Sequence, residues 1–283
     1  MDFLRPSTLD EALAMKAEFP AAVPIAGGTD VMVELNFDIR RPAALLDLGR
    51  VAELSRWSQE NGHVALGAAV PYTRVVTELA DVLPGLAMAS RTVGSPQIRN
   101  RGTVGGNLGS ASPAGDAHPP LLAVAADVEV ASVRGTRIVP AREFFSGPKK
   151  SALEPDELIV AVRVPNAAGP QQFAKVGTRN AMVIAVCSFA VALDVTNKSV
   201  GTGIGSAGPT PLRAREAEEF AVTELPWGTG KPLQENTARA FGELVAAAAR
   251  PMDDVRGSAA YRRHALSVLA RRALGWAWQE VVG

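Results

Sequence analysis

The chain has 283 residues, enough for two or three compact units. Its 29 basic and 29 acidic residues leave no net charge, without the basic excess of a nucleic-acid-binding protein. No apolar run is long enough to cross a bilayer, and the N-terminal sequence lacks a charged leader followed by an apolar stretch. We therefore predict a cytoplasmic protein with no membrane span and no nucleic-acid partner.

The first part of the chain alternates predicted helices and strands, in the manner of βαβ units. Thr8 and Glu11 have capping-box spacing at the start of the first helix. Pro71 is placed as the first residue of a later helix. The predicted elements are, in chain order, the helix DEALAMKAEF, the strands AAVPIA, ALLDL and HVALGAAV, and the helix PGLAMASRTV.

A glycine pair follows the first predicted apolar strand. Adjacent Gly27 and Gly28 let the backbone approach an anion closely, and Thr29 and Asp30 can supply a hydroxyl or cap the helix-like run that follows. This pattern indicates a phosphate-binding turn. An ordinary strand–turn–helix junction is the alternative.

Residues 94–116 break the alternation of helices and strands. They are rich in Gly, Ser, Pro and Asn, with little hydrophobic periodicity. A structureless loop of this length is uncommon in a compact domain unless it binds something. Its backbone N–H groups, hydroxyls and amide suit a diphosphate, and Asp116 can accept hydrogen bonds from ribose hydroxyls. A long surface loop is the alternative.

The C-terminal part reads as strands followed by helices, an α+β arrangement, after the linker 166–170. Gly203, Gly205 and Gly208 match the dinucleotide-binding pattern G-x-G-x-x-G, but prolines follow at once and oppose a helix starting there. We interpret these glycines as a strand end and a turn. The residues predicted to form the buried face of the last helix are Leu266, Leu269, Ala273 and Trp276.

Cysteine and histidine are too few to suggest a metal site. The chain has one cysteine, Cys187, and 3 histidines without metal-ligand spacing. An iron–sulfur cluster takes about four protein ligands, so we expect no metal in this chain. Cys187 lies in an apolar run and is predicted to be an inert core thiol.

Several segments resemble one family. AGGTDVMVEL and QIRNRGTVGGNLGSASPAGD resemble the FAD-binding segments of xanthine dehydrogenases and related molybdenum hydroxylases. FAKVGTRNAMVIAV and DDVRGSAAYRRHAL, with its D-x-R-G-S-x-x-Y-R signature, resemble the C-terminal region of the same family. The resemblance covers nearly the whole chain in order. Thr29-Asp30, where the carbon monoxide dehydrogenase branch carries His-Ser, favours the bacterial xanthine-dehydrogenase-like branch.

This resemblance implies an α+β protein with an FAD-binding domain of the vanillyl-alcohol-oxidase type over residues 1–168, with subdomains of about 1–55 and 56–168. An α+β C-terminal domain follows over residues 171–283. FAD is expected to be bound non-covalently, without a link to His118. A surface position for Lys175 is the alternative to its role near FAD. The residues that the resemblance assigns to FAD are Ile25, Ala26, Gly27, Gly28, Thr29, Asp30, Thr103, Gly105, Gly106, Asn107, Ser110, Asp116, Leu158, Ile159 and Lys175.

The family also implies an oxidoreductase built from several chains. A small iron–sulfur subunit with [2Fe–2S] clusters and a large subunit with the molybdenum cofactor are the expected partners, in a dimer of heterotrimers. Electrons would leave FAD for NAD+, oxygen or another acceptor, and the substrate would be xanthine or another purine. No catalytic acid or base is expected in this chain. The alternatives are the medium subunit of a carbon monoxide or aldehyde dehydrogenase, a self-contained flavin oxidoreductase, and a non-catalytic nucleotide-binding protein.

Overall fold

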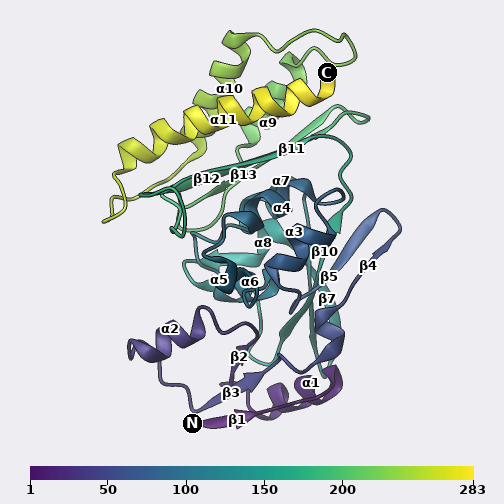
Figure 1. Cartoon of the computed structure of the whole chain (residues 1–283), viewed down its shortest axis with the longest axis vertical. Coiled ribbons are helices and arrows are strands. Elements are labelled where there is room, and N and C mark those ends of the chain that lie inside the picture. Colours follow the sequence, from purple (N-terminus) through teal and green to yellow (C-terminus); the bar gives the residue numbers. More distant parts are fainter.

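A small parallel sheet forms the N-terminal end of the protein in the computed structural model, which describes residues 1–283 (Figure 1). Helix α1 (Leu9–Glu18) connects its first two strands, and the Thr8 side chain accepts a hydrogen bond from Glu11 N, which confirms the predicted cap. The Glu11 carboxylate bonds Ser7 instead of the Thr8 N–H that a capping box would use. The strands lie in the order β1 (Asp2–Leu4), β3 (Ala44–Asp47) and β2 (Val23–Ile25).

An antiparallel sheet of five strands forms the middle of the molecule. Its strands are, in spatial order, β4 (Trp57–Glu60), β5 (His63–Gly67), β10 (Leu158–Pro165), β6 (Asp127–Ser132) and β7 (Gly135–Pro140). Strand β4 was not predicted from the sequence, and it pairs with β5 through a hairpin. At the turn of this hairpin Asn61 and Gly62 have φ of 50° and 78°, the left-handed values of a type I′ turn.

Helices cover this middle sheet and connect its strands. They are α3 (Tyr72–Glu78), α4 (Pro84–Arg91), α5 (Pro96–Arg99), α6 (Val104–Ser110), α7 (His118–Ala123) and α8 (Ala141–Phe144). Pro71 is the N-cap of α3 and not its first helical residue. Minor elements are a 3-10 turn (Ala52–Ser55) and the paired strands β8 (Phe145–Gly147) and β9 (Lys150–Ser151).

The prediction that residues 94–116 form a structureless loop is wrong, because α5 and α6 lie within them. Ser95 and Thr103 cap these helices through their hydroxyls, accepting hydrogen bonds from Ile98 N and Gly106 N. Such short helices have no room for a hydrophobic repeat. Only their caps mark them in the sequence.

A three-stranded antiparallel sheet and three helices form the C-terminal end. The strands are β11 (Gln171–Val176), β12 (Cys187–Asp194) and β13 (Ser199–Gly205), and the helices are α9 (Arg215–Glu224), α10 (Glu235–Ala248) and α11 (Ala259–Val282). Leu266, Leu269 and Ala273 are buried as predicted, but Trp276 is 44% exposed. Trp278, two residues on, is 1% exposed and donates to Lys231 O. The prediction for Trp276 is therefore wrong.

Glycines of β13 join the C-terminal sheet to helix α7. An ideal Cβ on Gly203 would lie 2.0 Å from Pro119 O, and one on Gly201 would lie 1.9 Å from Ala123 O. Only glycine lets these two backbones come so close. Gly203 and Gly205 lie in β13 and Gly208 lies in the bend after it, so the interpretation of these glycines as a strand end and a turn is confirmed.

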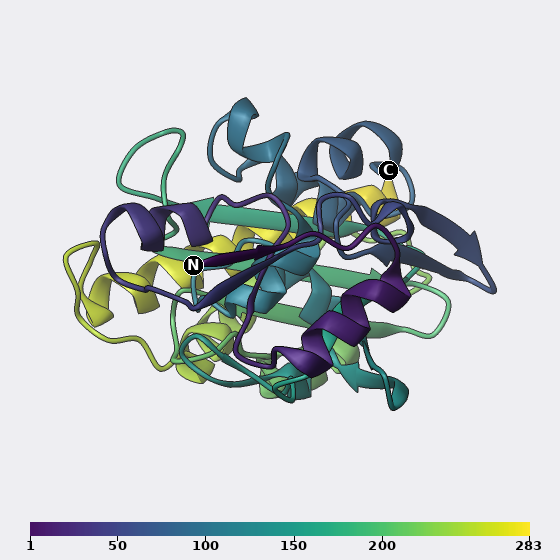
Figure 2. The ribbon, with the colours of Figure 1, turned by 90° about the horizontal axis from the view of Figure 1, so that it is seen from below.

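Helix α2 (Val31–Asn36) extends from the small parallel sheet and has no buried residue. Figures 1 and 2 show it on the opposite side of that sheet from α1. Viewed from below, α11 lies behind the sheets (Figure 2). None of the helices is both long and apolar enough to cross a membrane.

Candidate functional site

The first glycine pair lies in the turn between β2 and α2, where it contacts the second glycine-rich segment. An ideal Cβ on Gly27 would lie 1.8 Å from Arg101 O, so the two backbones touch. Gly28 has φ of 75°, a conformation that favours glycine. The predicted cap by Asp30 is wrong, because this exposed side chain makes no capping hydrogen bond. The structure therefore brings together two segments that lie about 75 residues apart in sequence, as residues 27 and 101 show.

The second segment is built around Thr103 at the start of α6. Its hydroxyl accepts from Gly106 N at 2.9 Å, and its carbonyl accepts from Asn107 N at 3.0 Å. These two N–H groups are therefore not free for a ligand. Gly105 packs on Ala68, the residue after β5, since an ideal Cβ would lie 2.5 Å from Ala68 O. This segment is a fixed capped helix, not the open loop expected from its composition.

Asn107 and Ser110 hold the segment that follows α6. Asn107 Oδ1 accepts from Ala117 N at 3.3 Å, and Ser110 Oγ donates to Asn107 O at 3.0 Å. His118 Nε2 lies 3.2 Å from Asn107 O, and burial lowers the pKa of His118 to about 4. The imidazole is therefore neutral at pH 7. These contacts fix the position of Asp116, which lies within the same segment.

Asp116 forms a buried ion pair with Lys175, from strand β11 of the C-terminal part. Lys175 Nζ lies 2.5 Å from Asp116 Oδ2, and the two side chains are 6% and 9% exposed. Lys175 Nζ also donates to Thr92 O at 3.1 Å. Burial raises the pKa of Asp116, while Lys175 and Thr92 oppose the rise. The alternative that Lys175 is a surface lysine is wrong.

Leu158 and Ile159 point to opposite faces of β10, as successive strand residues do. Ile159 reaches α6, since an ideal Cβ on Gly109 would lie 3.8 Å from Ile159 Cδ1. Leu158 is 1% exposed and packs with Leu46 and Leu54 in the core beside the N-terminal sheet. Only Ile159 therefore lies against the second glycine-rich segment.

The arginines near this segment divide into two kinds. Arg99 Nη1 donates to the carbonyls of Val93 and Gly94, at 3.1 and 3.2 Å, and so fixes the turn before α5. Arg91 and Arg101 are exposed. The backbone of Arg101, not its charge, provides the contact with Gly27.

Three buried polar atoms without a protein partner lie near the two segments: Tyr72 Oη, Asp116 Oδ1 and His118 Nδ1. Two others, Asn166 Oδ1 and Ser206 Oγ, belong to neither segment. Buried polar groups are normally hydrogen-bonded, so each of these atoms has capacity for a ligand or a water. Tyr72 was not predicted as a site residue, because an aromatic residue at a helix start carries no sequence signal beyond packing.

The other chemical features of the chain lie elsewhere. Cys187 is buried, which raises the pKa of its thiol to about 12 and makes it a poor nucleophile at pH 7. No group of three or more His, Cys, Asp or Glu side chains is arranged to hold a metal ion. A groove of about 320 Å³ lies along α10 and α11, with Arg271 and Trp276 among its lining residues.

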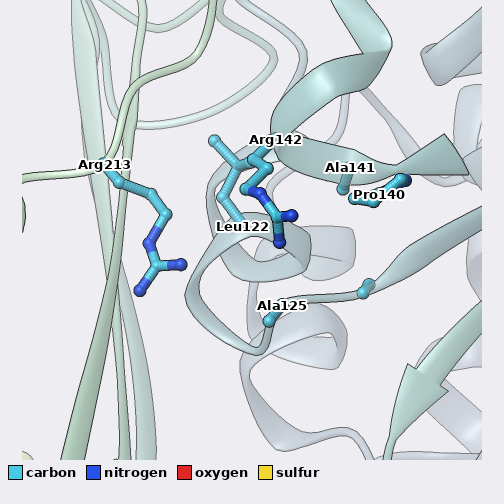
Figure 3. A pocket seen from close by; sticks show the side chains of 7 residues that line it. Leu122, Ala125, Pro140, Ala141, Arg142 and Arg213 are labelled. Carbon is cyan, nitrogen blue, oxygen red and sulfur yellow. The ribbon is translucent and has the colours of Figure 1, made fainter.

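A small pocket lies where α7 and the end of β7 face Arg213 (Figure 3). Its volume of about 10 Å³ is room for one water at most. The arginine beside it is already bound to Glu218, at 2.7 and 3.0 Å. This pocket is therefore too small to hold a cofactor, and the charge of its arginine is already paired with Glu218. Its lining residues are Leu122, Ala125, Ala126, Pro140, Ala141, Arg142 and Arg213.

Comparison with known proteins covers both parts of the chain. Residues 1–167 match the family model of the FAD binding domain in molybdopterin dehydrogenase, and residues 172–277 match that of the CO dehydrogenase flavoprotein C-terminal domain. The xanthine dehydrogenase FAD-binding subunit of Escherichia coli O157:H7 is 32% identical over 283 residues, covering 95% of this chain and 93% of that one. The nicotinate dehydrogenase FAD-subunit of Eubacterium barkeri is 32% identical, covering 94% and 92% of the two chains.

Solved structures show the same fold. A chain of quinoline 2-oxidoreductase from Pseudomonas putida 86 superposes with a TM-score of 0.91 at 28% identity, covering 100% of this chain and 98% of that one. A chain of carbon monoxide dehydrogenase from Hydrogenophaga pseudoflava gives 0.90 at 28% identity, covering 99% and 98%. The predicted two-part arrangement, an FAD-binding domain of the vanillyl-alcohol-oxidase type before an α+β domain, is confirmed as a fold. The chain belongs to the family of FAD-binding medium subunits of molybdenum hydroxylases, and is a flavoprotein subunit of an oxidoreductase.

Proposed function

We propose that FAD binds where the two glycine-rich segments meet and that this chain carries electrons from a partner chain to a soluble acceptor. The observation that carries the proposal is the backbone contact between Gly27 and Arg101, which joins the two segments beside unpartnered buried polar atoms. Such a junction fits a long ligand with many hydrogen-bonding groups. The residues proposed to line it are those at 25–30, with Thr103, Gly105, Gly106, Asn107, Ser110 and Asp116. Ile159 lies beneath α6, and Lys175 is paired to Asp116.

The chain's own residues have distinct roles in this proposal. Because Gly27 has no side chain, the two segments stay in contact. The Thr103 cap fixes the start of α6, where Gly105 packs on Ala68. Asp116 holds the Lys175 ammonium in place at the junction of β11 with the middle of the molecule. Bound FAD would supply redox chemistry, accepting electrons from one partner and delivering them to another.

Partner chains are proposed to hold the other redox centres. With one cysteine, this chain cannot supply the about four ligands of an iron–sulfur cluster. We propose [2Fe–2S] clusters in a small subunit and the molybdenum cofactor in a large one, assembled as a dimer of heterotrimers. The proposed acceptor is NAD+, oxygen or another acceptor. The proposed substrate is xanthine or another purine, and xanthine stands in the name of the Escherichia coli relative.

Purification of the native complex tests this function. The chain is recovered through an affinity tag with its partners, and flavin, iron and molybdenum are assayed together in the same fraction. The expected result is one FAD for each copy of this chain, with iron, molybdenum and purine-dependent reduction of the flavin absorbance. Flavin without co-purifying iron and molybdenum, or turnover by the chain alone, would contradict the proposal.

A further inference from the structure

Tyr72 lies at the point where the two glycine-rich segments meet. Its backbone N donates to Gly102 O at 3.0 Å, and the preceding residue, Pro71, forms an isolated bridge with Thr103. An ideal Cβ on Gly102 would lie 3.4 Å from both Tyr72 Cδ2 and Thr29 Oγ1. The Tyr72 ring therefore lies beneath the second segment and close to the first.

The hydroxyl of Tyr72 is buried without a hydrogen-bond partner. The residue is 3% exposed, and Oη has no partner within the protein. Burial, together with the carboxylates of Asp116 and Asp30, raises the pKa of Tyr72 well above its ordinary value. The phenol is therefore a neutral donor at pH 7, and both glycine-rich segments place a carboxylate near it.

Asp116 offers the complementary atom. Its Oδ2 bonds Lys175, but its Oδ1 is buried without a partner. An unpaired donor and an unpaired acceptor beside one junction favour a ligand group that can both accept and donate, which is the property of a hydroxyl. A phosphate oxygen could accept from Tyr72 but would leave Asp116 Oδ1 unpaired.

We infer that Tyr72 is an FAD-binding residue whose hydroxyl donates a hydrogen bond to a sugar hydroxyl of the cofactor. The same sugar hydroxyl donates a hydrogen bond to Asp116 Oδ1. The inference rests on the FAD site proposed above. Ribityl and ribose hydroxyls share this chemistry. Tyr72 thus adds a contact with the cofactor to those of the two glycine-rich segments, from beneath the point where they meet.

Removal of the one oxygen atom tests the inference. Tyr72→Phe keeps the ring in its apolar surroundings, and FAD binding to the apo chain is measured by titration for the wild type and the variant. We expect Kd for FAD to rise about 10-fold, since the sugar hydroxyl loses its donor. The melting temperature of the apo variant should equal or exceed that of the wild type, because an unpaired buried hydroxyl is removed.

Tyr261→Phe is the matched control, since Tyr261 is the other tyrosine of the chain and is 49% exposed. It should leave the Kd for FAD unchanged. Competition by riboflavin and by ADP then distinguishes the two sugars, because only the fragment that carries the contact binds more weakly to the Tyr72→Phe chain. Weakening of neither fragment would overturn the sugar contact.

Other outcomes distinguish failure of the Tyr72 contact from failure of the proposed FAD binding. A wild-type chain that binds no FAD contradicts the proposed function itself. If the wild type and Tyr72→Phe bind FAD equally well, the proposed FAD site is retained but the inference about Tyr72 is overturned. A water molecule bound to the Tyr72 hydroxyl would explain that result. A lower apo melting temperature for Tyr72→Phe would mean that Tyr72 bonds Asp116 directly, which also overturns it.

Discussion

Two backbone contacts of this chain look alike locally and differ in their surroundings. Gly27 meets Arg101 O, and Gly203 meets Pro119 O, and in each case an added Cβ would lie within 2.0 Å of the carbonyl oxygen. Near the first contact, Tyr72 and Asp116 keep buried polar atoms unpaired. At the second, a strand of the C-terminal sheet packs on α7. A glycine therefore marks close approach of two backbones, both where the two glycine-rich segments meet and where a strand packs on a helix.

The largest expected effect is on stability, at the ion pair beside the first contact. Lys175→Met leaves the Asp116 carboxylate buried without its partner, at an expected cost of about 3–5 kcal/mol in the free energy of unfolding. Urea unfolding checks this value. Arg163→Met, which breaks the more exposed pair with Glu129, is the control and should cost at most about 1 kcal/mol.

The destabilisation caused by Lys175→Met should depend on pH. Burial raises the pKa of Asp116 in the folded chain, and loss of Lys175 raises it further. A carboxyl whose pKa is higher in the folded than in the unfolded chain binds more protons in the folded state. The stability of the folded chain therefore falls as pH rises towards the folded pKa. The difference in unfolding free energy between wild type and Lys175→Met should therefore widen from pH 4 to pH 8. A difference that is constant over this range would contradict the buried pair.

Gly203→Ala breaks the second backbone contact. Its Cβ would lie 2.0 Å from Pro119 O, so β13 and α7 must move apart. We expect a loss of about 1–3 kcal/mol in unfolding free energy, with FAD affinity of the folded fraction unchanged. Gly275→Ala, in α11 with no atom near its ideal Cβ, should leave stability equal or higher. A large loss of FAD affinity in Gly203→Ala would assign this region to the cofactor and contradict our comparison.

Gly27→Ala breaks the first backbone contact and should act on the ligand. Its Cβ would lie 1.8 Å from Arg101 O, which forces the two segments apart. We expect Kd for FAD to rise about 10-fold or more, equivalent to about 1.4 kcal/mol. Gly109→Ala is the control within the second segment, because its Cβ would make only an ordinary contact, 3.8 Å from Ile159 Cδ1. Equal losses of affinity in both variants would argue against a special role for the Gly27 contact.

The smallest expected effect is the loss of a helix cap, for which two caps of the chain can be compared. Thr103 caps α6 near the first contact, and Ser258 caps α11 in the C-terminal part by accepting from Tyr261 N. Replacement of either cap by Ala should cost about 1 kcal/mol of stability. Only Thr103→Ala should also weaken FAD binding, as titration of both variants would reveal. Weaker binding in Ser258→Ala as well would mean that stability alone explains the loss.

Elements with a strong local signal were predictable from the sequence. The Thr8 cap acts within a few residues, as does the break that the prolines after Gly208 impose, and both agree with the structure. The family resemblance also rests on contiguous motifs, which is why it is confirmed by comparison. Local chemistry therefore accounts for most of the order of helices and strands.

Features that depend on tertiary contact were not predictable in this way. Lys175 and Asp116 are separated by 59 residues, and Pro71 and Thr103 form a bridge between two segments that are distant in the sequence. Trp276 and Trp278 differ by two positions, and the partners of α11 decide which of them is buried. No periodicity in a single segment contains this information.

A crystal structure of the chain with bound FAD tests the central claim most directly. We expect the cofactor against residues 25–30 and against Thr103, Gly105, Gly106, Asn107 and Ser110. A sugar hydroxyl should lie between Tyr72 Oη and Asp116 Oδ1. FAD bound against Gly203 to Gly208, or in the groove along α10 and α11, would contradict it.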